Sequence, residues 1–337
     1  MILVTGGTGM LGAHLLFQLV NSKEQVRATY RSESSFEKVK KIFGYYSEDV
    51  NELFSKIDWI KADMSDLPSL EDAFIGITKV YHIAALVSFD EADAKKMRTV
   101  NIHGTANIVN LCIAHDIEKL CFVSSIASIA KSVQKTKIDE DDEFNLITNN
   151  YSYAITKYGA EMEVWRGTQE GLDVFIVNPG VILGPGLWNE NSGLLFTMSY
   201  KESPLYTEGV TGFVGVHDVV SIMLKGMNSL VRNERFILVS ENISFKELFY
   251  LIADSLQRKR PRIKVTQFIA AVGWRLSWLK SKLTGSRNTF SKHTANSVNN
   301  KAYYDNNKVK NVFQFEFQSM KEVIQQISQQ FLKDKSA

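Results

Sequence analysis

Tyr153 and Lys157 are the residues whose types and spacing point most directly to chemistry. They lie four residues apart in a helical pattern, so both side chains fall on one helix face. An ammonium near a phenol favours the phenolate, so the spacing predicts that the pKa of Tyr153 is lowered toward neutrality. Such a tyrosine can give a proton to a carbonyl oxygen, or take one from an alcohol, while a nicotinamide exchanges hydride. Tyr304 and Lys308 share the spacing, but the two asparagines between them do not favour a helix.

Two serines, Ser124 and Ser125, stand where a buried strand over residues 120–123 ends. Ligands of doubly wound sheets bind beyond the carboxyl ends of the strands, so a serine at this place can hydrogen-bond a substrate oxygen. Taken alone, either hydroxyl is as readily a satisfied polar group at a strand end. Together with Tyr153 and Lys157 the serines predict a catalytic site, and the residues by themselves do not choose between the two.

A glycine-rich stretch, Thr5-Gly6-Gly7-Thr8-Gly9-Met10-Leu11-Gly12, separates the first predicted strand from the first predicted helix. Its glycines let the backbone turn tightly and approach a pyrophosphate, and the helix N-terminus adds free N–H groups and the positive end of its dipole. Because the loop follows a strand and opens an amphipathic helix, it predicts a dinucleotide-binding loop rather than a simple turn. The cofactor-binding residues expected here are Gly6, Thr8, Gly9, Met10, Leu11 and Gly12.

The end of the second predicted strand indicates which cofactor this loop holds. NAD-binding units carry a carboxylate for the ribose 2′-OH about 20 residues after the glycines, and this sequence has Arg31 there and no acid in residues 27–32. An arginine suits a 2′-phosphate, which a carboxylate would repel. The sequence therefore favours NADP(H), with NAD(H) as the alternative in which Glu33 serves the ribose.

Alternating strands and helices must position these groups. Strand–helix alternation over the first half of the chain predicts an α/β fold with a doubly wound, parallel Rossmann sheet. After Asn178 glycine and proline punctuate the chain and the rest is mostly helical, so we expect a dinucleotide-binding domain over 1–178 and a smaller substrate-binding domain over 179–337, with a strand near 236–239 that can return to the sheet. The predicted strands are 2–5, 26–30, 57–62, 80–84, 120–123 and 174–177.

Composition excludes several other classes of protein. The 337 residues are 45% hydrophobic and 23% charged, which is ordinary for a globular chain, and two cysteines form no disulfide framework. No Cys or His spacing suggests a metal site, no apolar stretch is long enough to span a membrane, and Met1 runs directly into the first strand. We expect a cytoplasmic protein that binds no metal.

The quoted motifs resemble those of the extended short-chain dehydrogenases/reductases in the NAD-dependent epimerase/dehydratase superfamily, over nearly the whole length. The resemblance implies that Ser125 is the triad serine beside Tyr153 and Lys157, and that Lys157 also holds the nicotinamide ribose. It further implies that Asp63 and Met64 contact the adenine, Ala84 lies near the ribose and pyrophosphate, and Pro179 borders the nicotinamide. Further matching stretches are Ala62-Asp63-Met64, His82-Ile83-Ala84-Ala85, Asn101-Ile102-His103-Gly104-Thr105 and residues 178–186.

Several of these residues also have purely structural explanations. Asp63 can be a helix N-cap and Pro179 a turn former. We expect His82 to be a buried strand histidine rather than a base, and His217 and Asn101 to have structural roles.

Within the superfamily the sequence favours a reductase. Residues 26–31 resemble the second strand of dihydroflavonol and cinnamoyl-CoA reductases, and no acid follows the triad serine as it does in dehydratases. Residues 177–180 lack the arginine common in sugar-nucleotide epimerases. The prediction is an NADP(H)-dependent enzyme that reduces a ketone or aldehyde or oxidises the alcohol. A 3β-hydroxysteroid dehydrogenase-like branch, a sugar-nucleotide epimerase and a non-catalytic cofactor sensor are the alternatives.

The sequence indicates a small carbonyl or alcohol substrate more clearly than it indicates any other partner. Residues 256–310 hold 13 Lys/Arg and one acid, yet no nucleic-acid motif accompanies them, so we expect no nucleic-acid binding. A helix predicted over Val265–Leu283 places Trp274 and Trp278 beside basic residues. This arrangement suits packing in the substrate domain, a peripheral contact with an anionic membrane, or capture of an apolar substrate of acyl or steroid type. The family resemblance implies a homodimer through helices near 93–115 and 152–170.

Overall fold

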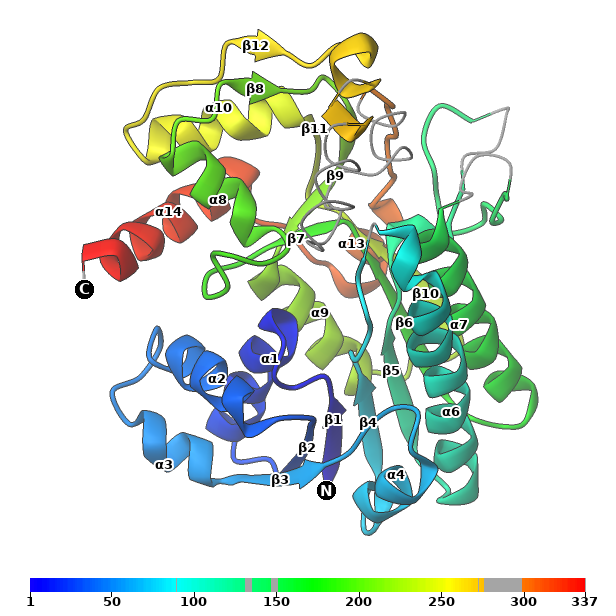
Figure 1. The fold of residues 1–337 in the computed structure, drawn as a ribbon. Helices are drawn as coiled ribbons and strands as arrows, with labels where there is room; N and C mark the ends of the chain where they lie inside the picture. The colour runs from blue at the N-terminus through cyan, green and yellow to red at the C-terminus, as the bar shows by residue number, and fades with distance from the viewer. Residues whose placement is uncertain (89, 131–134, 147–150, 272, 276–298, 337) are drawn as a thin grey trace.

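Seven parallel strands form the central sheet of the computed structural model, which describes all residues except 89, 131–134, 147–150, 272, 276–298 and 337 (Figure 1). The strand order is β10-β6-β5-β4-β1-β2-β3, so the chain reverses direction across the sheet between β1 and β4. In doubly wound sheets this switch point opens the crevice in which ligands bind. The strands are β1 Ile2–Thr5, β2 Val26–Tyr30, β3 Ile57–Lys61, β4 Lys79–His82, β5 Lys119–Val123, β6 Val174–Pro179 and β10 Glu234–Leu238.

Both faces of this sheet are buried, which explains the continuous apolar runs in its strands. Successive side chains of a strand point to opposite faces, so Phe175 and Val177 of β6 join one core cluster while Val174 and Ile176 join the other.

Helices cover the two faces of the sheet as separate layers (Figure 1). Residues of α1, α2, α9 and α13 share the core cluster on one face, and residues of α4, α6 and α7 share that on the other. The helices are α1 Met10–Asn21, α2 Phe36–Phe43, α3 Val50–Ser55, α4 Leu67–Phe74, α5 Ala94–Met97, α6 Gly104–Ala114, α7 Ser152–Gln169, α9 Val216–Met227 and α13 Asn307–Phe313, with a π-helical turn Arg98–His103 and 3₁₀ turns Glu33–Ser35, Glu91–Asp93 and Ile126–Ser128.

The C-terminal region adds a smaller, helical unit with short strands. Its core packs α8, α10 and α14 against a three-stranded sheet of order β11-β9-β7, and β8 pairs with β12. The strand expected near 236–239 is β10, which pairs with β6 of the central sheet, and the domain boundary at residue 178 stays a prediction. The elements are β7 Val181–Leu183, α8 Gly193–Tyr200, β8 Leu205–Tyr206, β9 Val210–Gly215, β11 Glu241–Ser244, α10 Phe245–Ser255, β12 Ile263–Lys264 and α14 Met320–Ser336.

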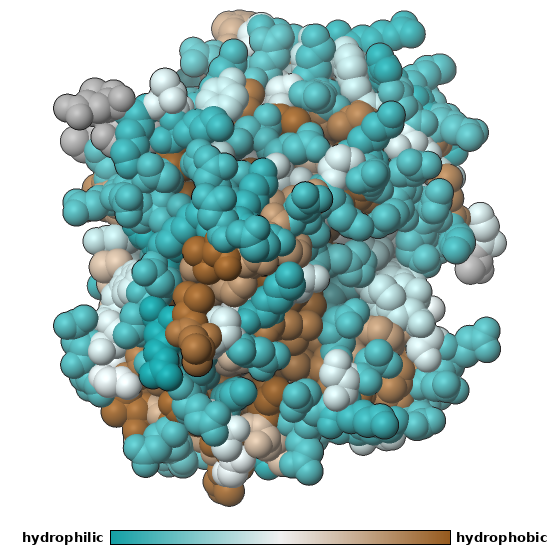
Figure 2. Space-filling model, turned by 180° about the vertical axis from the view of Figure 1, so that it is seen from behind, coloured by the Kyte–Doolittle hydropathy of each residue, from teal (hydrophilic) through white to brown (hydrophobic). Residues whose placement is uncertain are grey.

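Hydrophilic side chains cover most of the surface seen from behind, and the larger apolar patches lie in its lower half (Figure 2). Among the described residues, no helix has the length and apolar character needed to cross a bilayer. Of the predicted Val265–Leu283 helix, residues 267–271 and 273–275 are helical, and Trp278 lies outside the described residues.

Candidate active site

The glycine loop forms a cradle at the switch point of the sheet. Gly6 has a φ of +74°, and a Cβ there would lie 2.7 Å from the backbone nitrogen of Ala84, which follows β4. A Cβ on Gly12 would lie 2.2 Å from the Gly6 carbonyl oxygen. The open side is at Gly9, where a Cβ would have only that same oxygen within 4 Å, at 3.4 Å. The loop can therefore hold a pyrophosphate group that is contacted by backbone atoms rather than by side chains.

Helix α1 leaves its N-terminus to such a ligand. Gly9 is the N-cap residue and no side chain caps the helix, so its first N–H groups can donate to an anion. Thr8 and Met10 are half-buried in the loop, whereas the side chain of Leu11 is buried in the core, so Leu11 can offer a ligand only its backbone.

Arg31 lies just beyond β2 and is exposed, and no salt bridge to it is found among the described residues. The other arginine of this strand is committed to the fold: Arg27 pairs with Asp58 at 2.7 Å and donates to the carbonyl of Ile75 at 2.8 Å. Of the two, Arg31 is the one available to a ligand phosphate.

Asp63 and Met64 follow β3 on the same edge of the sheet. Hydrogen bonds from Ser65 lower the pKa of Asp63, with smaller contributions from the charges of Arg31 and Lys96, so the carboxylate is ionised beside Arg31. Met64 is buried, and its carbonyl accepts from Asn107 at 3.0 Å.

Tyr153, Ser125 and Lys157 meet at the carboxyl end of β5. Tyr153 and Ser125 are joined by a side-chain hydrogen bond, and the Ser125 Oγ also accepts from the Ala127 N–H at 3.1 Å. One helical turn on, Lys157 Nζ donates to the carbonyl of Val123 at 2.8 Å. Pro179, at the end of the neighbouring strand β6, is buried on the same edge.

The electrostatics of the tyrosine differ from the sequence prediction. Burial raises the pKa of Tyr153, and the hydrogen bond with Ser125 only partly opposes it, so the predicted lowering toward neutrality is wrong for this site. The reason is desolvation of the buried phenol, and the Lys157 ammonium donates to the carbonyl of Val123. Desolvation lowers the pKa of Lys157 to about 8, against the raising effect of Glu161.

The two serines have different surroundings. Ser124 is buried and its Oγ donates to Glu161 at 2.5 Å and lies 3.1 Å from Ser128 Oγ, whereas Ser125 faces Tyr153. The hydrogen bond with Tyr153 favours Ser125 as the serine that meets a substrate. Sequence reasoning missed Glu161, although a carboxylate one turn after Lys157 on the same helix was a signal for it.

Three further candidates have structural partners. His82 is buried between Thr5 Oγ1 at 2.7 Å and Thr105 Oγ1 at 2.9 Å, and burial lowers its pKa to about 3, so it is held neutral. Asn101, in the π-helical turn, bonds the backbone of Leu86 in both directions, at 2.7 and 3.0 Å. The ring of His217 makes edge contacts with those of His14 and Tyr46.

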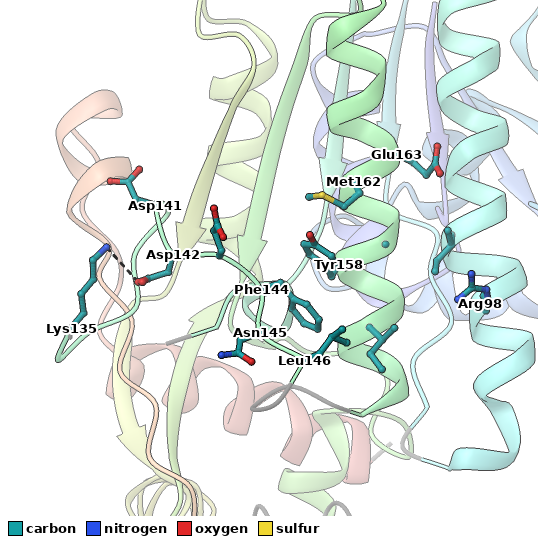
Figure 3. A pocket seen from close by; sticks show the side chains of 14 residues that line it. Arg98, Lys135, Asp141, Asp142, Phe144, Asn145, Leu146, Tyr158, Met162 and Glu163 are labelled. Carbon is teal, nitrogen blue, oxygen red and sulfur yellow. Dashed lines mark ion pairs between the residues drawn. The ribbon is translucent and has the colours of Figure 1, made fainter. Parts of the chain in front are cut away.

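A cavity of about 1030 Å³ lies on the other face of α7 (Figure 3). Tyr158 and Met162 line it from the helix, and Phe144, whose ring stacks on that of Tyr158, lines it from the segment after residue 134. Positions 155, 158, 159 and 162 point away from 153 and 157 by helical spacing, so this cavity is separate from the tyrosine and lysine. Within the described part of the chain no group of three metal-ligating side chains gathers.

Comparison with known proteins identifies the family. Residues 4–209 match the model of an NAD-binding family described as Male sterility protein, which covers more than half of the chain. The chain is an extended short-chain dehydrogenase/reductase. It is an NAD(P)-dependent oxidoreductase, and the loop at its N-terminus belongs to an NAD-binding domain.

Relatives of this dehydrogenase/reductase include reductases. A putative dihydroflavonol 4-reductase of Synechocystis sp. is 27% identical over 288 residues, 83% of this chain and 78% of the relative. Sterol demethylase protein B of Methylococcus capsulatus is 27% identical over 267 residues, 78% and 76% of the two chains. A solved UDP-glucose 4-epimerase of Thermotoga maritima superposes with a TM-score of 0.77 at 20% identity over 99% of both chains, which shows the fold alone.

Proposed function

We propose that this enzyme reduces a ketone or aldehyde, or oxidises the corresponding alcohol, with NADP(H) and a triad of Ser125, Tyr153 and Lys157. The observation that carries the proposal is the hydrogen bond between Tyr153 and Ser125, made at the carboxyl edge of the sheet with Lys157 one helical turn away. The relatives named as reductases support the same reaction class.

The cofactor, when bound, supplies or accepts the hydride. The chain's own residues then handle the substrate oxygen. The raised pKa of Tyr153 keeps its hydroxyl protonated at neutral pH, so in the reductive direction it can donate that proton to the carbonyl oxygen. Ser125 Oγ orients the same oxygen by hydrogen bonding. Lys157 holds a positive charge beside the tyrosine and would bond the nicotinamide ribose.

The preference for NADP(H) rests on the two arginines of the β2 edge. Arg27 is held by Asp58 and by backbone carbonyls, which leaves Arg31 to pair with a 2′-phosphate. On the adenine side, we propose that Asp63 and the backbone of Met64 contact the base. At the switch point, Ala84 would approach the ribose and pyrophosphate, and Pro179 would border the nicotinamide.

A carbonyl screen tests the proposal. Dihydroflavonols, aryl aldehydes and steroid ketones are incubated with NADPH or NADH, and cofactor oxidation is followed by absorbance. Tyr153→Phe should lower turnover about a hundredfold or more while NADPH still binds. Tyr158→Phe, on the opposite face of the same helix, is the matched control and should keep the wild-type rate. Wild-type turnover by Tyr153→Phe would refute the triad, and tight NADPH binding with no substrate in the panel would favour a cofactor sensor.

The assignments of partner and place also remain proposals. We propose a cytoplasmic enzyme that forms a homodimer through the helices near 93–115 and 152–170. Light scattering gives the solution mass directly, and a monomer at assay concentration would contradict the dimer.

A further inference from the structure

Glu161 is a buried carboxylate on α7 that contacts the turn carrying Ser125. Its side chain is 1% exposed, and Oε2 accepts hydrogen bonds from Ser124 Oγ at 2.5 Å, Ser128 Oγ at 2.7 Å and Asn178 Nδ2 at 2.8 Å. Carboxylates are almost never buried unless they are paired and fully bonded. The three donors come from the end of β5, the 3₁₀ turn after it and β6, so one carboxylate oxygen ties together three segments.

The second oxygen of Glu161 meets a half-buried cation. Arg235 Nη1 of β10 lies 2.9 Å from Oε1, and the Arg235 side chain is 15% exposed. The guanidinium is held in turn by the carbonyls of Glu140 and Asp142, each at 2.8 Å. Trp165 Nε1 donates to Oε1 at 3.3 Å. The ion pair is therefore fixed from the helix, the sheet and the loop at once.

The cluster holds the triad serine from both sides. Ser128 Oγ lies 2.7 Å from both the Ser125 carbonyl oxygen and Glu161 Oε2 and shares its one proton between these two acceptors. Asn178 Nδ2 donates to the same carbonyl at 3.2 Å and to Glu161. Ser124, the residue before it, donates to the same carboxylate. Lys157 lies one helical turn before Glu161, with its Nζ bonded to the carbonyl of Val123.

A buried ion pair is a poor way to gain stability, because removing two charges from water offsets most of their attraction. Well-packed apolar residues would fill the space behind the turn at least as well. The bonds of Glu161 instead converge on the backbone that carries Ser125, which indicates a role in orientation.

We propose that Glu161, paired with Arg235, is a positioning residue for the reaction proposed above: its carboxylate fixes the turn that presents Ser125 to Tyr153 and places a negative charge one helical turn from Lys157. The inference rests on the proposed function. The charged and titratable groups around the cluster include Tyr153 and Lys157 on α7, Arg235 on β10, His82 on β4, Lys308 on α13, and Glu140 and Asp142 on the segment packed against β10.

Glu161→Gln tests the proposal, with Glu163→Gln as the matched control. Glu163 lies on the same helix and pairs with Arg166 at 2.9 Å, away from the serines. With NADPH and the panel carbonyl that the wild type reduces fastest, Glu161→Gln should lower kcat about tenfold to a hundredfold. NADPH affinity, read by fluorescence titration, should stay within about twofold. Glu163→Gln should leave both values unchanged.

The pH profile separates positioning from simple structural support. Without the Glu161 charge Lys157 loses its proton more easily, so the alkaline limb of kcat in Glu161→Gln should move down by about half a pH unit or more. Glu161→Asp keeps the charge and should keep the wild-type limb even where its kcat falls. An unchanged kcat and limb in a Glu161→Gln protein of reduced stability would overturn the proposal.

Two further variants, Ser124→Ala and Tyr153→Phe, separate the role of Glu161 from the proposed function. If Glu161→Gln does not fold, Ser124→Ala removes one bond to the carboxylate and keeps the charge; it should lower kcat without moving the limb, and a wild-type kcat would overturn the proposal. Tyr153→Phe reports on the proposed function alone. Wild-type turnover by Tyr153→Phe refutes the triad, whereas an inactive Tyr153→Phe beside an unimpaired Glu161→Gln refutes only the role of Glu161.

Discussion

At the scale of single residues, the proposed preference for NADP(H) depends on Arg31. Arg31→Ala should weaken NADPH binding by about tenfold to a hundredfold, because a charge-assisted bond to phosphate is worth roughly 1.5–3 kcal/mol, and should leave NADH binding nearly unchanged. Fluorescence titration with each cofactor measures both affinities. Arg27→Ala is the control: it removes the bonds to Asp58 and Ile75, so it should lower stability without changing the ratio of the two affinities. An equal loss for both cofactors in Arg31→Ala would contradict the assignment.

Lys157 makes stability depend on pH. Its pKa is lowered by burial to about 8 from its ordinary value of 10.5, so between those values the unfolded chain binds more protons than the folded one. Stability therefore rises with pH across this window, since the folded state is relieved of a buried charge. Lys157→Met lacks this contribution, so the wild type should gain a few kcal/mol relative to the variant between pH 8 and 10.5. Urea unfolding of both proteins at several pH values checks it, and a constant difference would be the contrary result.

The candidate catalytic residues were easier to predict from the sequence than their pKa values. Residue type and spacing were enough to bring forward Tyr153, Lys157 and the serine pair, because a helix face and a strand end are local geometry. The direction of the Tyr153 pKa was wrong because it depends on burial and on where the Lys157 ammonium points, which only the packed structure fixes. Arg235 could not be predicted at all, since β10 meets α7 only through the assembled sheet.

At the scale of elements, the loop between β1 and α1 depends on a backbone contact that no side chain can share. Gly12→Ala would put a Cβ 2.2 Å from the Gly6 carbonyl oxygen and 2.8 Å from the Gly7 Cα, so loop and helix would have to move apart. We expect it to lower stability and to abolish detectable NADPH binding. Gly44→Ala is the control, since its φ is −64° and its Cβ would approach nothing closer than 3.4 Å. Fluorescence titration and urea unfolding report both effects, and NADPH binding by Gly12→Ala at wild-type affinity would show that the loop can adjust.

The regular elements of the parallel sheet were predictable, and the small sheet was not. Runs such as 2–4 and 174–177 are apolar throughout because both faces of the strand are covered, which is a signal carried by the strand itself. Strands β7 and β11 are short, and the strands of this sheet pair across long stretches of chain, Val181 with Phe213 and Phe213 with Glu241. Such pairing depends on the tertiary fold, so the alternation of apolar and polar residues within one strand does little to predict it.

At the scale of the whole molecule, charge is divided unequally along the chain. Residues 256–310 carry 13 Lys/Arg and one acid in a protein whose net charge is only +2. Part of this charge is neutralised within the fold, since Arg260 pairs with Asp254 and Lys264 with Glu208. The described part of the same segment also exposes apolar side chains: Ile263 is 48% exposed and Phe268 77%. Cations beside exposed apolar groups are the composition of an interfacial surface.

Vesicle sedimentation decides whether that surface meets a membrane. Trp274 packs partly against Val265 and Ala270, with the Arg275 guanidinium 4.9 Å from its ring centroid, so this tryptophan is at least in part a packing residue. If the surface binds lipid, the protein should sediment with vesicles containing an anionic phospholipid, not with neutral ones, and the bound fraction should fall as salt screens the charges. Phe268→Ser should weaken binding, whereas Leu230→Ser, which removes a side chain 90% exposed beyond α9, should not. No sedimentation with anionic vesicles at low salt would rule out the membrane contact and leave the basic segment as a solvated face.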